Sequence, residues 1–213
     1  METEKSQLVT LIKKLNQQGH NPGTSGNYSL RPIPTELVQQ KPYVYVSQSG
    51  LDKEFFELSH LLKVDLESGL LLENNNLKNI KSSDETEVHL AIYRNTNAGC
   101  VLHSHMESAL LFAELFPEKM ILTITQMEMI KVFPGITSHE EILEILCYPN
   151  TQDIKKLATI ISPNLKIKRQ CNGLILRDHG IYVWGENVKE TKKHLEAFDY
   201  LFHYVVKKAL LKK

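Results

Sequence analysis

The chain has 213 residues, 42% of them hydrophobic, and its 25 basic residues balance its 25 acidic residues. This balance lacks the basic excess of a nucleic-acid-binding surface, so we expect no nucleic-acid partner. No run approaches the roughly 20 apolar residues needed to cross a bilayer, so we expect no membrane partner.

Two features indicate a cytoplasmic protein. The first five residues, Met1-Glu2-Thr3-Glu4-Lys5, lack the apolar core of a signal peptide. The three cysteines are scattered and odd in number, which argues against a disulfide framework and fits a reducing compartment. We expect Cys100 and Cys171 to be core residues, because their neighbours are apolar.

The first half of the chain alternates helical and extended patterns. Leu8, Leu11, Ile12 and Leu15 follow helical spacing, and Gly19 is expected to end that helix. A loop of small residues then runs into a strand over 23–30. Further strands are predicted at 43–46 and 62–66, and a surface loop or hairpin at 74–76.

The second half continues the alternation. Residues 82–85 are predicted to cap a helix over 86–95. Strands are predicted at 100–103, 174–176 and 181–184, and helices at 106–116, 151–161 and 191–211, while 126–132 is ambiguous. No linker or repeat divides the chain. We therefore predict one layered α/β domain over residues 1–213.

Three histidines follow or end apolar, strand-like runs. His103 and His105 are two residues apart, so they point to the same side if the strand continues through them. His179 follows the apolar run 174–176 and could complete a shell of three nitrogens with an open fourth position, as in catalytic zinc sites. The alternative is an accidental pair of surface histidines, because the chain contains nine.

Loops rich in glycine and hydroxyl groups suggest an anion site. They are the segment 23–27, the pair Ser49-Gly50 and the pair Ser82-Ser83 before the predicted helix. Backbone N–H groups in such loops and at helix starts can bind phosphate. Each loop alone is more typical of an ordinary turn. Lys53 could add positive charge.

Two glutamates are candidate acid–base groups. Glu128 lies between methionines and isoleucine, and a carboxyl in apolar surroundings has a raised pKa that suits proton transfer. The alternative is a solvated helix face. Glu85 is four residues before His89 on the same predicted helix face, so it is either a site carboxylate or an ordinary acid of a first helical turn.

The order of four motifs resembles the class II aldolase and adducin-like superfamily, which also holds ribulose-phosphate 4-epimerases. The motifs are Gly-Thr-Ser-Gly-Asn ending at Asn27, Ser-Gly-x-x-Lys from Ser49, His-Ser-His from His103 and Asp-His-Gly around His179. The resemblance spans about residues 8–206. It implies a three-layer α/β/α fold with a central, mostly antiparallel sheet.

Segments 126–131, 180–185 and 198–202 resemble the dehydratase branch of that superfamily. That branch acts in methionine salvage, where it converts 5-methylthioribulose 1-phosphate to 2,3-diketo-5-methylthiopentyl 1-phosphate. The resemblance therefore implies a lyase. The alternatives are an aldolase or a 4-epimerase on the same fold, or a non-catalytic domain of the adducin type.

The resemblance also implies a role for each candidate residue. One Zn²⁺ per subunit would be bound by His103, His105 and His179. The catalytic acid–base group would be Glu128, and Glu85 a second acid or a substrate contact. The substrate phosphate would be held by Asn27, Ser49, Gly50 and Ser83. Asp84 would be unfavourable near that phosphate unless it points away. Relatives form fourfold rings, so a homotetramer is expected.

Overall fold

The computed structural model describes residues 2–32, 41–72, 80–167 and 171–212. Its centre is an eight-stranded sheet in the order β3-β2-β1-β4-β8-β7-β6-β5. All neighbouring strands are antiparallel except β6 and β7, which are parallel. The strands are β1 (Asn27–Leu30), β2 (Tyr43–Ser47), β3 (Leu61–Asp65), β4 (Cys100–Ser104), β5 (Ile121–Ile124), β6 (Leu143–Tyr148), β7 (Gly173–Leu176) and β8 (Gly180–Gly185).

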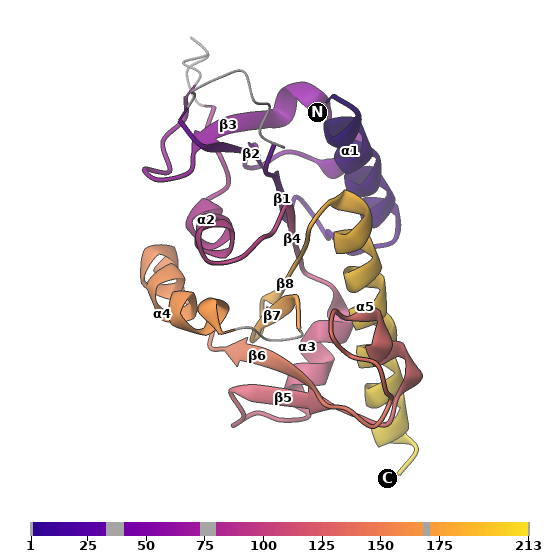
Figure 1. The fold of residues 1–213 in the computed structure, drawn as a ribbon. Coiled ribbons are helices and arrows are strands. Elements are labelled where there is room, and N and C mark those ends of the chain that lie inside the picture. Colours follow the sequence, from indigo (N-terminus) through magenta and orange to yellow (C-terminus); the bar gives the residue numbers. More distant parts are fainter. Residues whose placement is uncertain (1, 33–40, 73–79, 168–170, 213) are drawn as a thin grey trace.

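Helices cover both faces of this sheet, which confirms the predicted three-layer α/β/α fold (Figure 1). One face carries α1 (Glu2–Gln17), α3 (Glu107–Glu114) and α5 (Val188–Leu210), and the other carries α2 (Thr86–Asn95) and α4 (Ile154–Lys166). Three short 3₁₀ helices complete the fold, namely η1 (Lys53–Phe55), η2 (Leu58–His60) and η3 (Glu128–Val132). Within the described residues, no helix has both the length and the apolar character to cross a membrane.

The apolar stripes of the helices form two cores, one on each face of the sheet. Leu8 and Ile12 of α1 and Phe198 and Phe202 of α5 are fully buried against the first face. Burying a side chain of this size contributes about 1.5–3 kcal/mol, so these stripes are what fix the helices to the sheet. Cys100 and Cys171 are buried core thiols, as predicted.

Most predicted elements are present, with three differences. The first is that β5 and β6 were not predicted. β5 is only four residues long, and spacing alone in its sequence Ile-Leu-Thr-Ile does not distinguish a strand from a helical segment. The second is that the N-cap of α2 is Glu85, the last of the predicted capping residues 82–85, but its side chain makes no capping hydrogen bond. The third is that 126–132 contains a 3₁₀ helix. The predicted loop at 74–76 lies outside the described residues.

The middle of the sheet is a three-strand unit, β1-β4-β8, that aligns the candidate site. In its register, His103 of β4 lies between Asn27 of β1 and Tyr182 of β8. Gly180 begins β8 at a point of close approach, because a Cβ atom there would lie 2.3 Å from the Ser104 carbonyl oxygen. Only glycine therefore allows the turn that carries His179 to lie directly against β4.

Candidate metal centre

Three imidazoles meet where β4 ends and β8 begins. The ring centroids of His103, His105 and His179 are separated by 4.9, 4.9 and 4.7 Å. One ring nitrogen from each lies within 4.8 Å of the other two, which is a spacing that a single metal ion can bridge. His105 lies one residue past the end of β4, so the chain keeps the same-side geometry expected for a His-x-His pair.

The hydrogen bonds of His103 leave one nitrogen available to a metal. Its Nδ1 lies 3.1 Å from the Ile181 carbonyl oxygen, so this nitrogen carries the proton and donates it. Its Nε2 is buried without a hydrogen-bond partner. Burial lowers the pKa of His103 to about 3 and also lowers the pKa of His105. Both rings are therefore neutral near pH 7, which is the form that binds a divalent metal.

Glu85 places a carboxylate against this cluster. Its two oxygens lie 3.3 Å from the Nε2 atoms of His103 and His179. Burial would raise the pKa of Glu85. The two histidines and a hydrogen bond from Asn27 outweigh that effect and lower the pKa to about 2. Glu85 is therefore ionised, and the site combines three imidazoles with one buried negative charge. A divalent cation fits this donor set and would offset that charge.

Asn27 lies beside Glu85 and is nearly fully buried. Its Nδ2 donates to Glu85 Oε2 at 2.5 Å, and its Oδ1 lies 2.5 Å from His89 Nε2. Both the NH₂ group and the oxygen of the amide are thus hydrogen-bonded inside the protein. The phosphate contact of Asn27 stays a prediction, because its side chain here bonds to Glu85 and His89.

The cluster opens into a pocket of about 780 Å³. Most of the predicted site residues line this pocket together, namely Asn27, Ser49, Gly50, Ser83, Glu85, His105 and His179. Gln152 and Asp153, which directly precede α4, also line the pocket. Nothing in the sequence indicated that they would lie at the site. The structure thus brings the hydroxyl-bearing loops and the histidines to one cavity.

Lys53, which also lines the pocket, joins the two loops. Its Nζ donates to the carbonyl oxygens of Thr24 at 2.8 Å and Leu51 at 2.9 Å, and only 1% of the residue is exposed. Burial lowers the pKa of Lys53 to about 8. No described carboxylate lies within ion-pair distance of it. A buried ammonium group beside an open pocket favours an anionic ligand there.

Asp84 also lines the pocket, where it is paired with a lysine. Its carboxylate is exposed and binds Lys81 Nζ at 2.8 Å. The neighbouring Ser83 accepts a hydrogen bond from the Glu85 N–H through its Oγ, so its hydroxyl proton remains available. The pairing with Lys81 partly offsets the negative charge of Asp84, whose effect on a bound phosphate stays a prediction.

Glu128 lies elsewhere, and its expected apolar surroundings are not found within one chain. Its side chain is 72% exposed at the start of η3, and Oε1 lies 2.5 Å from Lys131 Nζ. This ion pair lowers the pKa of Glu128 instead of raising it. Glu128 lines a different cavity, of about 540 Å³, beside Tyr200 and Tyr204 of α5. The local sequence could not reveal this, because Met127 and Met129 pack on the core while Glu128 points outward.

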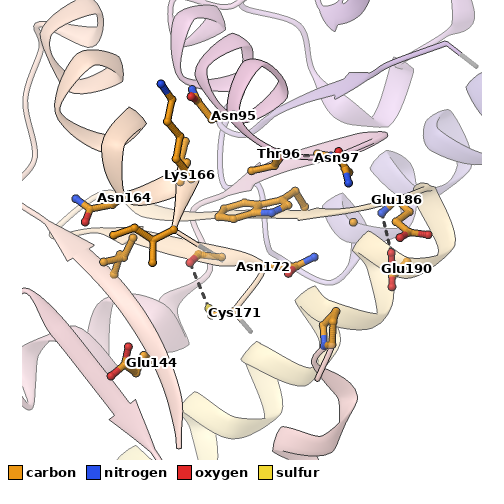
Figure 2. A pocket seen from close by; sticks show the side chains of 18 residues that line it. Asn95, Thr96, Asn97, Glu144, Asn164, Lys166, Cys171, Asn172, Glu186 and Glu190 are labelled. Atoms are coloured by element: carbon orange, nitrogen blue, oxygen red, sulfur yellow. Dashed lines mark hydrogen bonds between the residues drawn. The ribbon is translucent and has the colours of Figure 1, made fainter. Parts of the chain in front are cut away.

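A further cavity of about 370 Å³ contains none of the predicted site residues (Figure 2). Its labelled side chains are mainly amides and carboxylates, with Asn164 and Glu144 at the left of the view and Asn97, Glu186 and Glu190 at the right. The chemistry that the histidines can support is therefore confined to the pocket beside β4 and β8.

Sequence reasoning missed or undervalued three residues around the centre. From the sequence, Lys53 was expected only to add positive charge, and its burial was not predicted. His89 lies four residues after Glu85, and that spacing was noted without a partner for the imidazole. Tyr182 stacks on His103 with ring centroids 4.2 Å apart. Its place opposite His103 depends on the strand register, which the sequence does not give.

Comparison with known proteins agrees with this geometry. Residues 6–206 match the family described as Class II Aldolase and Adducin N-terminal domain. A methylthioribulose-1-phosphate dehydratase of Picosynechococcus sp. is 33% identical over 94% of this chain and 90% of its own length. The enzyme of that name from Pseudomonas fluorescens is 33% identical over 94% and 91%.

Among solved structures, L-fuculose-1-phosphate aldolase from Thermus thermophilus has a TM-score of 0.74 with 20% identity, covering 100% of this chain and 98% of its own. At this identity, the likeness concerns the fold.

The buried histidines predict acid destabilisation of the metal-free protein. His89 is fully buried, and burial lowers its pKa to about 4. It is neutral when folded and takes up a proton when unfolded below its ordinary pKa. Stability is therefore lost as the pH falls from about 6.5 towards 4, by about 1.4 kcal/mol per pH unit for this one group.

The His89→Gln variant cannot take up this proton. Between pH 7 and pH 5 we expect it to lose about 2 kcal/mol less unfolding free energy than the native chain, as measured by urea titration without metal. Equal losses in the two proteins would show that His89 is not held neutral.

Proposed function

The chain belongs to the class II aldolase and adducin N-terminal domain family, and we propose that it is a methylthioribulose-1-phosphate dehydratase. This hydro-lyase would convert 5-methylthioribulose 1-phosphate to 2,3-diketo-5-methylthiopentyl 1-phosphate in methionine salvage. One observation carries the proposal. A cluster of three histidines and one carboxylate opens into a pocket walled by hydroxyl-bearing loops. The curated relatives that share this name cover more than nine-tenths of the chain.

The cofactor we assign is one Zn²⁺ per subunit, held by His103, His105 and His179. Three protein ligands with one open position are typical of catalytic zinc. When bound, the metal would polarise the C2 carbonyl of the substrate and make the C3 proton more acidic. Glu85, whose carboxylate lies against two of these histidines, would help to hold the cation and would face the substrate from the same wall.

The phosphate would lie at the other end of the pocket. Ser49 and Ser83 offer hydroxyl groups, Gly50 offers its backbone N–H, and Lys53 supplies a buried positive charge. An anion held there would offset the cost of burying the ammonium group. With the phosphate fixed at C1, the C2 and C3 positions of a five-carbon chain point along the pocket towards the histidines.

Glu128 would be the acid–base group. It would accept the C3 proton and then return it to the C4 hydroxyl, which leaves as water, and tautomerisation of the resulting enol would give the diketone. Within one chain, Glu128 does not line the histidine pocket. We therefore propose that the neighbouring subunit of a homotetramer supplies it. Its solvent-facing position on η3 leaves it free to reach across a subunit boundary. The cytoplasmic location stays a prediction from the sequence.

The reaction is tested by supplying purified protein with 5-methylthioribulose 1-phosphate, with and without prior chelation of metal. We expect the diketone to form with the zinc-loaded protein, and turnover to fall at least a hundredfold after chelation. Carbon–carbon cleavage or inversion at C4 in place of dehydration would instead identify an aldolase or a 4-epimerase. Either result would overturn the proposed reaction.

A mixing experiment tests where Glu128 acts. Glu128→Gln and His179→Ala should each be nearly inactive alone. In mixed tetramers, a site with intact histidines can meet an intact Glu128 from its neighbour, so random assembly should restore about a quarter of native activity.

As a control, mixing His179→Ala with His103→Ala should restore nothing, because both variants damage the same half of the site. If the first mixture also stays inactive while Glu128→Gln alone is inactive, then Glu128 acts within its own chain.

A further inference from the structure

A chain of hydrogen bonds runs behind the metal centre, in the interior between α2 and the sheet. Tyr93 Oη lies 2.8 Å from Ser29 Oγ, and Ser29 Oγ lies 2.6 Å from His89 Nδ1. His89 Nε2 lies 2.5 Å from Asn27 Oδ1, and Asn27 Nδ2 lies 2.5 Å from Glu85 Oε2. The five side chains thus connect Tyr93, near the C-terminal end of α2, to the carboxylate beside the metal ligands.

The spacing of the two elements explains why these side chains meet. Glu85, His89 and Tyr93 are four residues apart along α2 and its N-cap, so they repeat every ~6 Å on one helix face. Asn27 and Ser29 are two residues apart on β1, so they repeat every ~6.8 Å on one strand face. The two repeats nearly match, and the helix and strand side chains therefore alternate along the contact.

In each hydrogen bond of this network, only one assignment of donor and acceptor is possible. The ionised Glu85 accepts, so the Asn27 group that touches it is the NH₂ group, and Asn27 Oδ1 must face His89. His89 Nε2 therefore carries the ring proton, and His89 Nδ1 accepts the proton of Ser29 Oγ. Ser29 Oγ in turn accepts from Tyr93 Oη. Every donor points towards Glu85, an arrangement in which successive hydrogen bonds strengthen one another.

The side chains of this hydrogen-bond network are largely shielded from water. Ser29 and His89 are fully buried, Tyr93 is 2% exposed and Asn27 is 7% exposed. Apolar side chains would fill this interior at lower cost, because each buried polar group must keep its partner. The completeness of the network indicates that its polar groups have a task beyond packing, and it reaches the pocket at Asn27 and at the carboxylate of Glu85.

We propose that His89 is a positioning residue that fixes the amide of Asn27 and, through it, the carboxylate of Glu85 against the metal-binding histidines. This inference rests on the proposed metal-dependent function of the same site. His89 touches neither the metal ligands' free nitrogens nor the pocket. Its effect on the centre passes through Asn27 and Glu85.

Two variants of similar size separate positioning from space-filling. His89→Gln keeps an N–H donor near the Nε2 position, whereas His89→Met fills a similar volume without a donor. The probe is Zn²⁺ alone, bound in competition with a chromophoric chelator, so the reading does not depend on the substrate. We expect His89→Met to weaken zinc binding about tenfold and His89→Gln to remain within threefold of native, since partners of metal-site groups typically contribute 10–100-fold.

The native chain offers a matched control. His194 is also fully buried, with its Nδ1 2.9 Å from the Trp184 carbonyl oxygen, and it packs on Phe133 away from the pocket. His194→Met should lower stability and leave zinc affinity unchanged. A second control places His89→Met in a Glu85→Gln background. If His89 acts through Glu85, then adding His89→Met to the Glu85→Gln protein should weaken its zinc binding less than twofold further.

The outcomes are distinct. Weaker zinc binding in His89→Met that recovers in His89→Gln supports the proposal. Native zinc affinity in a folded His89→Met protein overturns it. An equal loss of zinc affinity in His89→Met and His89→Gln also overturns it. So does a full tenfold loss when His89→Met is added to the Glu85→Gln protein. If His89→Met does not fold, then His89→Asn, which keeps only the Nδ1-side group, takes its place with the same expectation. Because zinc binding is measured without substrate, a native protein that fails to dehydrate the proposed substrate is a separate result.

Discussion

The site depends on one structural constraint, the antiparallel pairing of β4 between β1 and β8. That register sets His103 beside Asn27 on one strand and Tyr182 on the other. It also makes the turn before β8 lie against the end of β4, so that His179 reaches the other two histidines. Because sheet register is fixed by which residues are buried, a slip by one residue would turn His103 to the opposite face. Both cores therefore protect the geometry of the metal centre.

Charge is the second determinant of the site. Glu85 is ionised in a buried position, and the neighbouring imidazoles are neutral because burial lowers their pKa values. An uncompensated buried carboxylate is costly. A divalent cation among the three histidines would leave a net positive charge, which suits a substrate that carries a phosphate and develops negative charge on oxygen. The buried Lys53, which also lines the pocket, has the same preference. Both groups thus favour an anionic ligand in this cavity.

The chemistry-bearing motifs were predictable from the sequence because each is local. The His-x-His pair and the third histidine adjoin apolar strands, in which alternate side chains point to the same face. The start of α2 follows the polar capping residues 82–85. What the sequence could not give depends on contacts between distant segments. The engagement of Asn27 by Glu85 and His89 requires α2 to pack on β1. The exposure of Glu128 depends on its flanking methionines taking the buried positions. The strands β5 and β6 were missed because short apolar runs such as these do not by spacing alone distinguish a strand from a helix.

One chain brings together the proposed metal ligands and the hydroxyl-bearing loops. The histidines lie at the ends of β4 and β8, Glu85 is the N-cap of α2, and the loops line the same pocket, while the proposed acid–base group Glu128 lines a different cavity. Such a division would tie activity to assembly, because metal binding would need only one subunit and turnover would need two.

Diffraction at wavelengths on either side of the zinc absorption edge, from crystals of the protein purified with zinc, would locate the ion. We expect one anomalous peak per subunit, bounded by ring nitrogens of His103, His105 and His179. A zinc-loaded crystal whose peak lies at other residues, or that shows no peak among these three, would contradict this assignment.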